Sequence, residues 1–125
     1  MDLQPGVSGR TVLVVAAADT ASSLHTGVVP VLATPRLVAL CEEAACCAVD
    51  PLLPEGTTTV ACRVQFDHLA PIRVGSEVQA EAVLERVEGR RITFTVSVTD
   101  ASGLVGAGRV TRVVVDLDTF MAKAR

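Results

Sequence analysis

Three polar residues could do chemistry because each lies within or next to a segment that is otherwise mainly apolar: Thr34, Glu42 and His68. A carboxylate can act as a general base toward water or attack a carbonyl group directly. An imidazole can move protons near neutral pH. A threonine at the start of a helix lies beside backbone N–H groups that can stabilise an oxyanion. The three residues are therefore candidates for acid–base and nucleophilic chemistry.

Each candidate also has a purely structural interpretation. Thr34 suits the N-cap of a helix, where its hydroxyl would accept backbone N–H bonds. His68 follows a predicted strand and suits the surface. Glu42 shares a helix face with apolar side chains, so its carboxylate must be paired, hydrated or functional. Its neighbour Glu43 is expected to point to solvent.

The helix that would carry two of these residues starts at Thr34-Pro35, since proline is well tolerated in the first helical turn. Apolar residues at 37, 40, 41, 44, 45 and 48 have helical spacing, and Asp50-Pro51 ends the helix. The helix is rich in small residues and apolar nearly all round, which indicates burial on most sides. We therefore expect a second copy of the chain to cover the face that the sheet leaves open, in a homodimer.

Alternation with a period of two predicts five strands, over residues 11–16, 57–66, 76–87, 90–100 and 104–117. Tight turns join the last three in an antiparallel meander. The broad apolar stripe of the helix needs a sheet to cover it. The sequence thus predicts one α+β domain over residues 1–125, with a curved antiparallel five-stranded sheet wrapped around one central helix. Between the first strand and the helix we expect irregular chain with one helical turn after Asp19.

Composition excludes several classes of function. The 125 residues are 50% hydrophobic with a net charge of −3 spread along the chain, which argues against a nucleic-acid partner. No apolar run approaches the roughly 20 residues that span a bilayer, and the N-terminus lacks signal-peptide order, so we expect a cytoplasmic protein without a membrane partner. The four cysteines lack zinc-site spacing, and Gly-x-Ser-x-Gly and GxGxxG motifs are absent. Neither a metal nor a cofactor is expected.

The chain resembles the hotdog-fold thioesterases and, within them, the fluoroacetyl-CoA thioesterase-like family. The specific part of the resemblance is spacing, with eight residues from Thr34 to Glu42 and twenty-six from Glu42 to His68, as in the family. The stretches that carry it are Ala33-Thr34-Pro35 with Leu40-Cys41-Glu42, residues 87–91 with Phe94-Thr95-Val96-Ser97, and Arg112 with residues 120–125.

The resemblance implies a hotdog fold that hydrolyses an acyl-CoA thioester, with Thr34, Glu42 and His68 as catalytic residues and Val28, Ala61 and Arg112 as substrate-binding residues. The fluoroacetyl-specific enzyme has phenylalanines before the helix, whereas residues 24–31 here contain no aromatic side chain. We therefore expect a short or medium acyl-CoA as the substrate. A non-catalytic acyl-CoA or small-ligand binding protein on the same fold stays open, and a hotdog dehydratase is a weaker third alternative.

Helix geometry constrains how the site is assembled. At about 1.5 Å of rise per residue, Thr34 and Glu42 lie about 12 Å apart along one helix, too far for a hydrogen bond. Two antiparallel helices across a two-fold axis would bring Thr34 of one chain close to Glu42 of the other. We therefore expect composite sites at the dimer interface, with Arg36, Arg90 and Arg91 as candidates to meet the phosphates of CoA.

Overall fold

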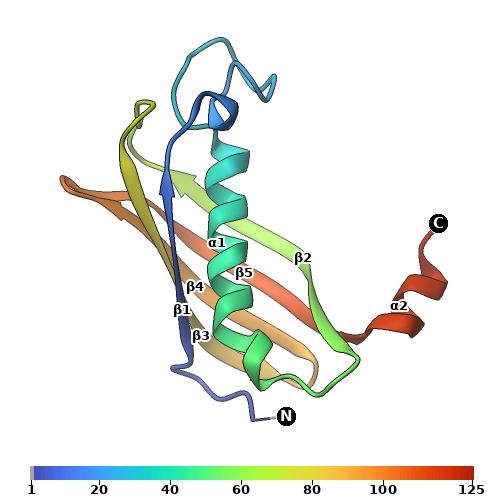
Figure 1. Ribbon diagram of the computed structural model, residues 1–125. Helices are drawn as coiled ribbons and strands as arrows, with labels where there is room; N and C mark the ends of the chain where they lie inside the picture. Colours follow the sequence, from blue (N-terminus) through green and yellow to red (C-terminus); the bar gives the residue numbers. More distant parts are fainter. Residues whose placement is uncertain (1) are drawn as a thin grey trace.

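A computed structural model describes residues 2–125, in which one long helix lies against a single antiparallel sheet (Figure 1). No helix in this part of the chain is long and apolar enough to cross a membrane. The strands are β1 (Ser8–Val14), β2 (Thr57–His68), β3 (Glu77–Glu88), β4 (Arg91–Asp100) and β5 (Gly103–Asp116). The helices are α1 (Thr34–Val49) and α2 (Leu117–Lys123), with short 3-10 turns at Ala17–Asp19 and Asp50–Leu52.

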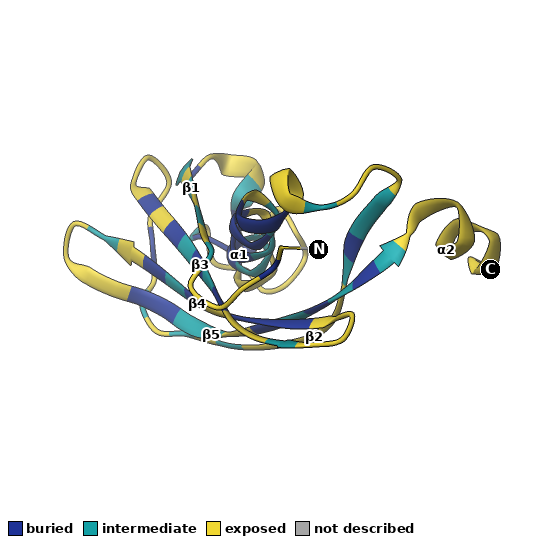
Figure 2. Cartoon of the chain, turned by 90° about the horizontal axis from the view of Figure 1, so that it is seen from below, coloured by how far each residue is buried: buried dark blue, intermediate teal, exposed yellow. Residues whose placement is uncertain are grey.

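The sheet has the strand order β1-β3-β4-β5-β2, so β1 and β2 form its edges. Its register slips by one residue at three places, which leaves Cys62, Glu85 and Val105 as extra residues in their strands. Such bulges bend a strand and increase its twist. Figure 2 shows the sheet curving beneath α1. The predicted curved five-stranded sheet around one central helix is confirmed.

The core lies between the concave face of the sheet and one side of α1. Leu37 and Leu40 of the helix are fully buried, as are Ile92 and Phe94 of β4. Removing each large apolar side chain from water contributes about 1.5–3 kcal/mol. Figure 2 shows the buried residues gathered between helix and sheet. This contact fixes the helix on the sheet, and with it the residues that α1 carries.

Close packing of β1 on α1 explains why the helix is rich in small residues. Gly9 of β1 lies against the helix backbone, so that a Cβ at this position would overlap the carbonyl oxygen of Ala44 and lie 2.5 Å from the amide nitrogen of Ala48. Both alanines are buried. Residues 2–125 leave the other side of the helix uncovered, since Glu43 and Cys47 there are exposed.

Two local predictions differ from the structure. The helical turn expected after Asp19 instead ends at Asp19, whose carboxylate accepts a 2.8 Å bond from the Ala16 N–H and so closes the turn. The last strand is followed by α2, a helix that the sequence pattern did not predict. The side chain of Asp116 caps α2 by accepting the N–H of Thr119. Figure 1 shows α2 projecting away from the sheet, and none of its residues is buried. The helix therefore needs no apolar stripe, which is the sequence pattern that would have predicted it.

Candidate active site

Thr34 and His68 meet in a direct hydrogen bond of 2.8 Å between the threonine Oγ1 and the imidazole Nδ1. The other ring nitrogen, Nε2, lies 2.9 Å from the carbonyl oxygen of Ala70. A carbonyl can only accept, so Nε2 carries a proton. In the neutral ring Nδ1 then accepts, and the hydroxyl of Thr34 donates to it. The pair therefore holds the threonine oxygen in one orientation, with the imidazole as its proton partner.

Two segments far apart in the sequence are tied together to form this pair. The N–H of Leu32, just before α1, donates to the carbonyl of Ile72, just after β2, at 2.8 Å. On the other side, the N–H of Leu69 donates to the carbonyl of Val105 at 2.7 Å. These bonds place the first residue of α1 beside the last residue of β2. The pair is thus held by backbone on both of its flanks.

The expectation that Thr34 caps the helix through its side chain is wrong. Ala33 occupies the N-cap position, and Thr34 is the first helical residue, with no side-chain cap bond. The hydroxyl of Thr34 bonds His68 instead, which local sequence preferences do not reveal.

A cavity of about 350 Å³ opens beside the pair. Both Thr34 and His68 line it, and the rest of its wall is largely aliphatic, including Val29, Val31 and Leu69. An apolar cavity with a few convergent polar groups is the usual form of a small-molecule site. The polar side chains in the wall are those of Thr26, Thr34 and His68, and the bonded hydroxyl and imidazole suit proton transfer next to an apolar substrate group.

Glu42 does not join this pair within one chain. Its Oε1 accepts a 3.0 Å bond from Nη1 of Arg112, whose side chain is only 8% exposed. The guanidinium also donates to both oxygens of Thr59, at 2.8 Å to Oγ1 and 2.8 Å to the carbonyl. Of the three alternatives for this carboxylate, which were paired, hydrated or functional, the structure shows that it is paired. Its side chain remains 32% exposed.

A second cavity, of about 610 Å³, lies over the uncovered side of α1 and includes Glu42 and Arg112 in its wall. Because α1 is one continuous helix from Thr34 to Val49, Glu42 stays about 12 Å along the axis from the Thr34 end. Each chain thus presents two separate polar centres, the Thr34–His68 pair at the helix start and the Glu42–Arg112 pair at mid-helix.

Cys46 also lines the second cavity and is a possible competitor for the role of nucleophile. Burial raises the pKa of its thiol above the ordinary value, although the positive charge of Arg112 and a hydrogen bond with Thr59 act in the opposite direction. A thiol needs to ionise to attack a carbonyl. Cys46 is therefore poorly suited to be the nucleophile, and Glu42 is the better candidate in this cavity.

The remaining candidate residues lie near the surface. Val28 is 92% exposed in the loop before α1, where its neighbour Val29 lines the first cavity. Ala61 is exposed on β2, directly opposite Arg112 in the register of β5. The structure thus places Ala61 beside the Glu42–Arg112 pair, on the strand that also carries Thr59.

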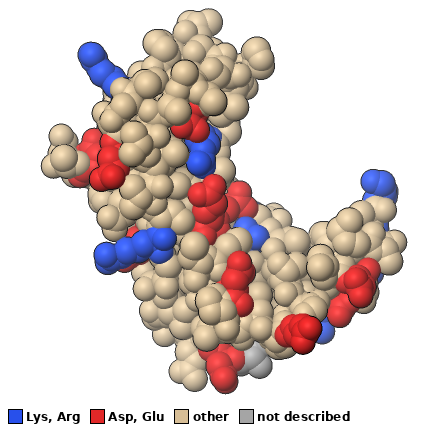
Figure 3. Space-filling view, viewed as in Figure 1, with Lys and Arg blue, Asp and Glu red and all other residues tan. Residues whose placement is uncertain are grey.

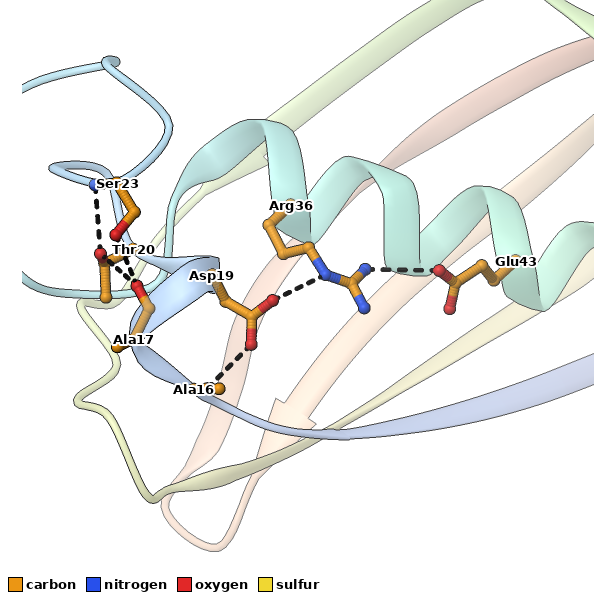
Figure 4. A network of polar contacts seen from close by, with 7 residues as sticks. All are labelled: Ala16, Ala17, Asp19, Thr20, Ser23, Arg36 and Glu43. Carbon is orange, nitrogen blue, oxygen red and sulfur yellow. Dashed lines mark hydrogen bonds and ion pairs between the residues drawn. The ribbon is translucent and has the colours of Figure 1, made fainter.

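Arg36, a candidate for phosphate binding, is already engaged with two carboxylates. Figure 4 shows its guanidinium between Asp19 and Glu43, at 3.1 Å and 3.4 Å. This chain of contacts ties the segment before α1 to the helix surface. Figure 3 shows acidic and basic side chains interspersed over this face of the molecule. Arg90 lies in the β3–β4 turn and Arg91 begins β4, and both are exposed.

The fold recurs in solved structures of known class. A hot-dog-like protein from Thermanaerovibrio acidaminovorans matches with a TM-score of 0.90 and 28% identity, over 98% of this chain and 94% of that one. A hypothetical protein from Thermus thermophilus, a member of the thioesterase superfamily, matches with a TM-score of 0.90 and 30% identity, over 98% and 91%. The structure is therefore a hotdog fold of the thioesterase type.

The family is narrower than that class. The family model for fluoroacetyl-CoA-specific thioesterase matches residues 15–118. The fluoroacetyl-CoA thioesterase of Streptantibioticus cattleyicolor is 36% identical over 95 residues, which is 76% of this chain and 68% of that protein. A solved structure of a fluoroacetyl-CoA thioesterase matches with a TM-score of 0.92 and 29% identity, over 98% of this chain and 96% of that one. The chain belongs to the fluoroacetyl-CoA-specific thioesterase family and is an acyl-CoA thioesterase, which confirms the resemblance seen in the sequence.

Proposed function

We propose that this thioesterase hydrolyses short or medium acyl-CoA at a site made by two chains, with Thr34 and His68 from one chain and Glu42 from the other. The observation that carries the proposal is the 2.8 Å hydrogen bond between Thr34 and His68 at the wall of an aliphatic cavity. A hydroxyl fixed by an imidazole beside an apolar cavity suits an acyl group whose carbonyl is the reacting centre.

The uncovered side of α1 supports a composite site. Glu42 faces a cavity of about 610 Å³ that no part of its own chain fills. Antiparallel pairing of two α1 helices would place the Thr34 end of one helix over this cavity of the other. The partner's helix would then supply the missing cover, and the two polar centres of each chain would become two complete sites in the dimer.

The chemical roles follow from the groups and their partners. Glu42 takes a proton from water as the water oxygen adds to the thioester carbonyl. Alternatively the carboxylate adds to that carbonyl itself, and water then cleaves the resulting mixed anhydride, which releases the acid and regenerates Glu42. Backbone N–H groups of the first turn of α1 stabilise the resulting oxyanion. The carbon–sulfur bond then breaks, and the CoA thiolate takes up a proton. Thr34 and His68 position the reacting oxygen, and the imidazole of His68 accepts the proton that came from water and donates it to the thiolate.

The cavity wall supports a broader acyl group than fluoroacetyl. A point mutant of a related fluoroacetyl-CoA-specific thioesterase, 29% identical to this chain with a TM-score of 0.89, has been solved with fluoroacetate and CoA. In this chain the wall before the helix is built from Val29 and Val31. Valine fills less space than an aromatic side chain, so the site should accept acyl groups with several carbon atoms.

The test is release of free CoA thiol from a panel of acyl-CoAs, from acetyl and fluoroacetyl through increasing chain length. We expect turnover that is faster for short or medium chains than for fluoroacetyl-CoA, and a loss of at least about 100-fold in Glu42→Ala. Glu85→Gln is the matched control, because it removes a carboxylate that pairs with Arg109 away from both cavities. Binding of CoA without turnover of any acyl-CoA, or full activity in Glu42→Ala, would contradict the proposal.

A further inference from the structure

Arg112 uses its guanidinium almost completely on protein partners. Nε donates to the hydroxyl of Thr59 and Nη2 to the carbonyl oxygen of the same residue, both at 2.8 Å. Nη1 donates to Oε1 of Glu42 at 3.0 Å. The side chain is only 8% exposed, and it lies in the wall of the cavity of about 610 Å³. Thr59 therefore binds the Nε and Nη2 side of the guanidinium, and Nη1 is left to bond the carboxylate of Glu42.

The sheet makes this grip rigid. Thr59 lies on β2 opposite Val114 of β5, and Ala61 lies opposite Arg112, so that Thr59 and Arg112 are diagonal neighbours on paired strands. The extra residue at Cys62 marks the bulge just beyond them. Both side chains point toward α1, since both are buried while residues next to them are more exposed. The paired strands β2 and β5 thus hold the guanidinium of Arg112 against Glu42 in the middle of α1.

The carboxylate is held by one oxygen only. Oε1 of Glu42 accepts the bond from Arg112, and among residues 2–125 no group bonds Oε2. Glu42 lines the cavity of about 610 Å³ over the uncovered side of α1. A charge-assisted bond to one oxygen fixes the orientation of the group while the other oxygen stays available to react.

We propose that Thr59 and Arg112 are positioning residues, which act through Glu42 by holding its carboxylate with Oε2 free for the reaction. This inference rests on the proposed catalytic role of Glu42. It adds Thr59 to the site, and it gives Arg112 a positioning role beside the substrate contact that the family resemblance implied. Holding a reacting group in its productive geometry raises the rate of the chemical step and leaves substrate binding nearly unchanged.

The experiment is steady-state thiol release by Thr59→Val and by its matched control Thr59→Ser. Valine has nearly the shape of threonine but removes the Oγ1 that accepts from Nε of Arg112, whereas serine keeps that oxygen. We expect Thr59→Val to lower kcat by about tenfold or more with KM within about twofold, and Thr59→Ser to restore kcat to near the wild-type value. Urea unfolding at the assay temperature establishes that each variant is folded.

A second variant, Arg112→Lys, keeps the charge but cannot bond Thr59 twice and Glu42 at once. We expect it to lower kcat with little change in KM. A raised KM with kcat intact would make Arg112 a substrate contact and overturn the inference. So would wild-type kcat in Thr59→Val, or a loss in Thr59→Ser as large as that in Thr59→Val. An inactive Glu42→Ala beside an unchanged Thr59→Val refutes only this inference, whereas an active Glu42→Ala refutes the proposed function itself.

Discussion

Mixing two inactive variants tests whether one active site is built from two chains. Thr34→Ala removes the hydroxyl that bonds His68 at 2.8 Å, and Glu42→Ala removes the carboxylate about 12 Å further along the same helix. Each variant alone should lose activity, because every site in its homodimer lacks one of the two groups. In a mixed dimer, one site carries both substitutions and the other site carries neither.

The size of the recovery follows from counting sites. If the two variants exchange subunits statistically, half of the dimers are mixed, and one of the two sites in each mixed dimer is intact, so about a quarter of the wild-type activity should return. Each variant alone should stay at least about 100-fold below wild type. The recovery is therefore large against the background of either parent.

The assay is thiol release after the two variants, carrying different affinity tags, are co-expressed or exchanged at equal amounts. Isolation through both tags in turn gives the mixed dimer, which should show about half of the wild-type rate per dimer, because one of its two sites is intact. A mixed dimer as inactive as its parents would refute the composite site, since Thr34 and Glu42 would then have to act within one chain. Recovery of a monomer from both variants would refute the dimer on which the reasoning depends.

Three further outcomes are expected. Thr34→Val and His68→Gln should each lower kcat by about 100-fold. Because the bonded pair acts as a unit, the double variant should have a kcat no lower than that of the less active single variant. Additive losses in the thiol-release assay would contradict this. Gly9→Ala should destabilise the fold by about 1–3 kcal/mol in urea unfolding, because the added methyl meets helix backbone, and wild-type stability would show that β1 can move aside. Burial, with a smaller effect of the neighbouring Glu42 charge, raises the pKa of Cys41 to about 12, whereas an unfolded thiol ionises near pH 9. Above pH 9 the unfolded chain therefore binds fewer protons than the folded chain. The free energy of unfolding should fall there by about 1.4 kcal/mol per pH unit. Cys41→Ala should reduce that slope and leave the part that the raised pKa of the Cys46 thiol contributes. The comparison is readable because the chain has no tyrosine and only one lysine.

The fold could be predicted because its elements follow strong local patterns. The alternation in the strands and the helical spacing of the apolar residues from 37 to 48 both reflect burial on one face, and the structure buries those faces. The strand ends were less certain, and β1 begins at Ser8 rather than residue 11. The helix α2 was missed because a short exposed helix needs no apolar stripe.

The site was predicted only in part because its contacts join residues far apart in sequence. Thr34, Glu42 and His68 stood out as polar residues in apolar surroundings, but nothing local indicated that the hydroxyl of Thr34 bonds His68. Thr59 was missed since it is one of three successive threonines and its partner Arg112 is 53 residues away. The usable signal was alternation, because Arg112 falls on the inward-facing positions of β5, where a buried cation needs a partner.

Backbone hydrogen bonds hold the segments that carry Thr34 and His68, so this pair forms as soon as one chain folds. The carboxylate half, in contrast, is completed only by encounter with another chain in the arrangement proposed above. A newly synthesised or highly diluted monomer would then not hydrolyse acyl-CoA. Turnover per chain would rise with protein concentration until all chains are dimeric.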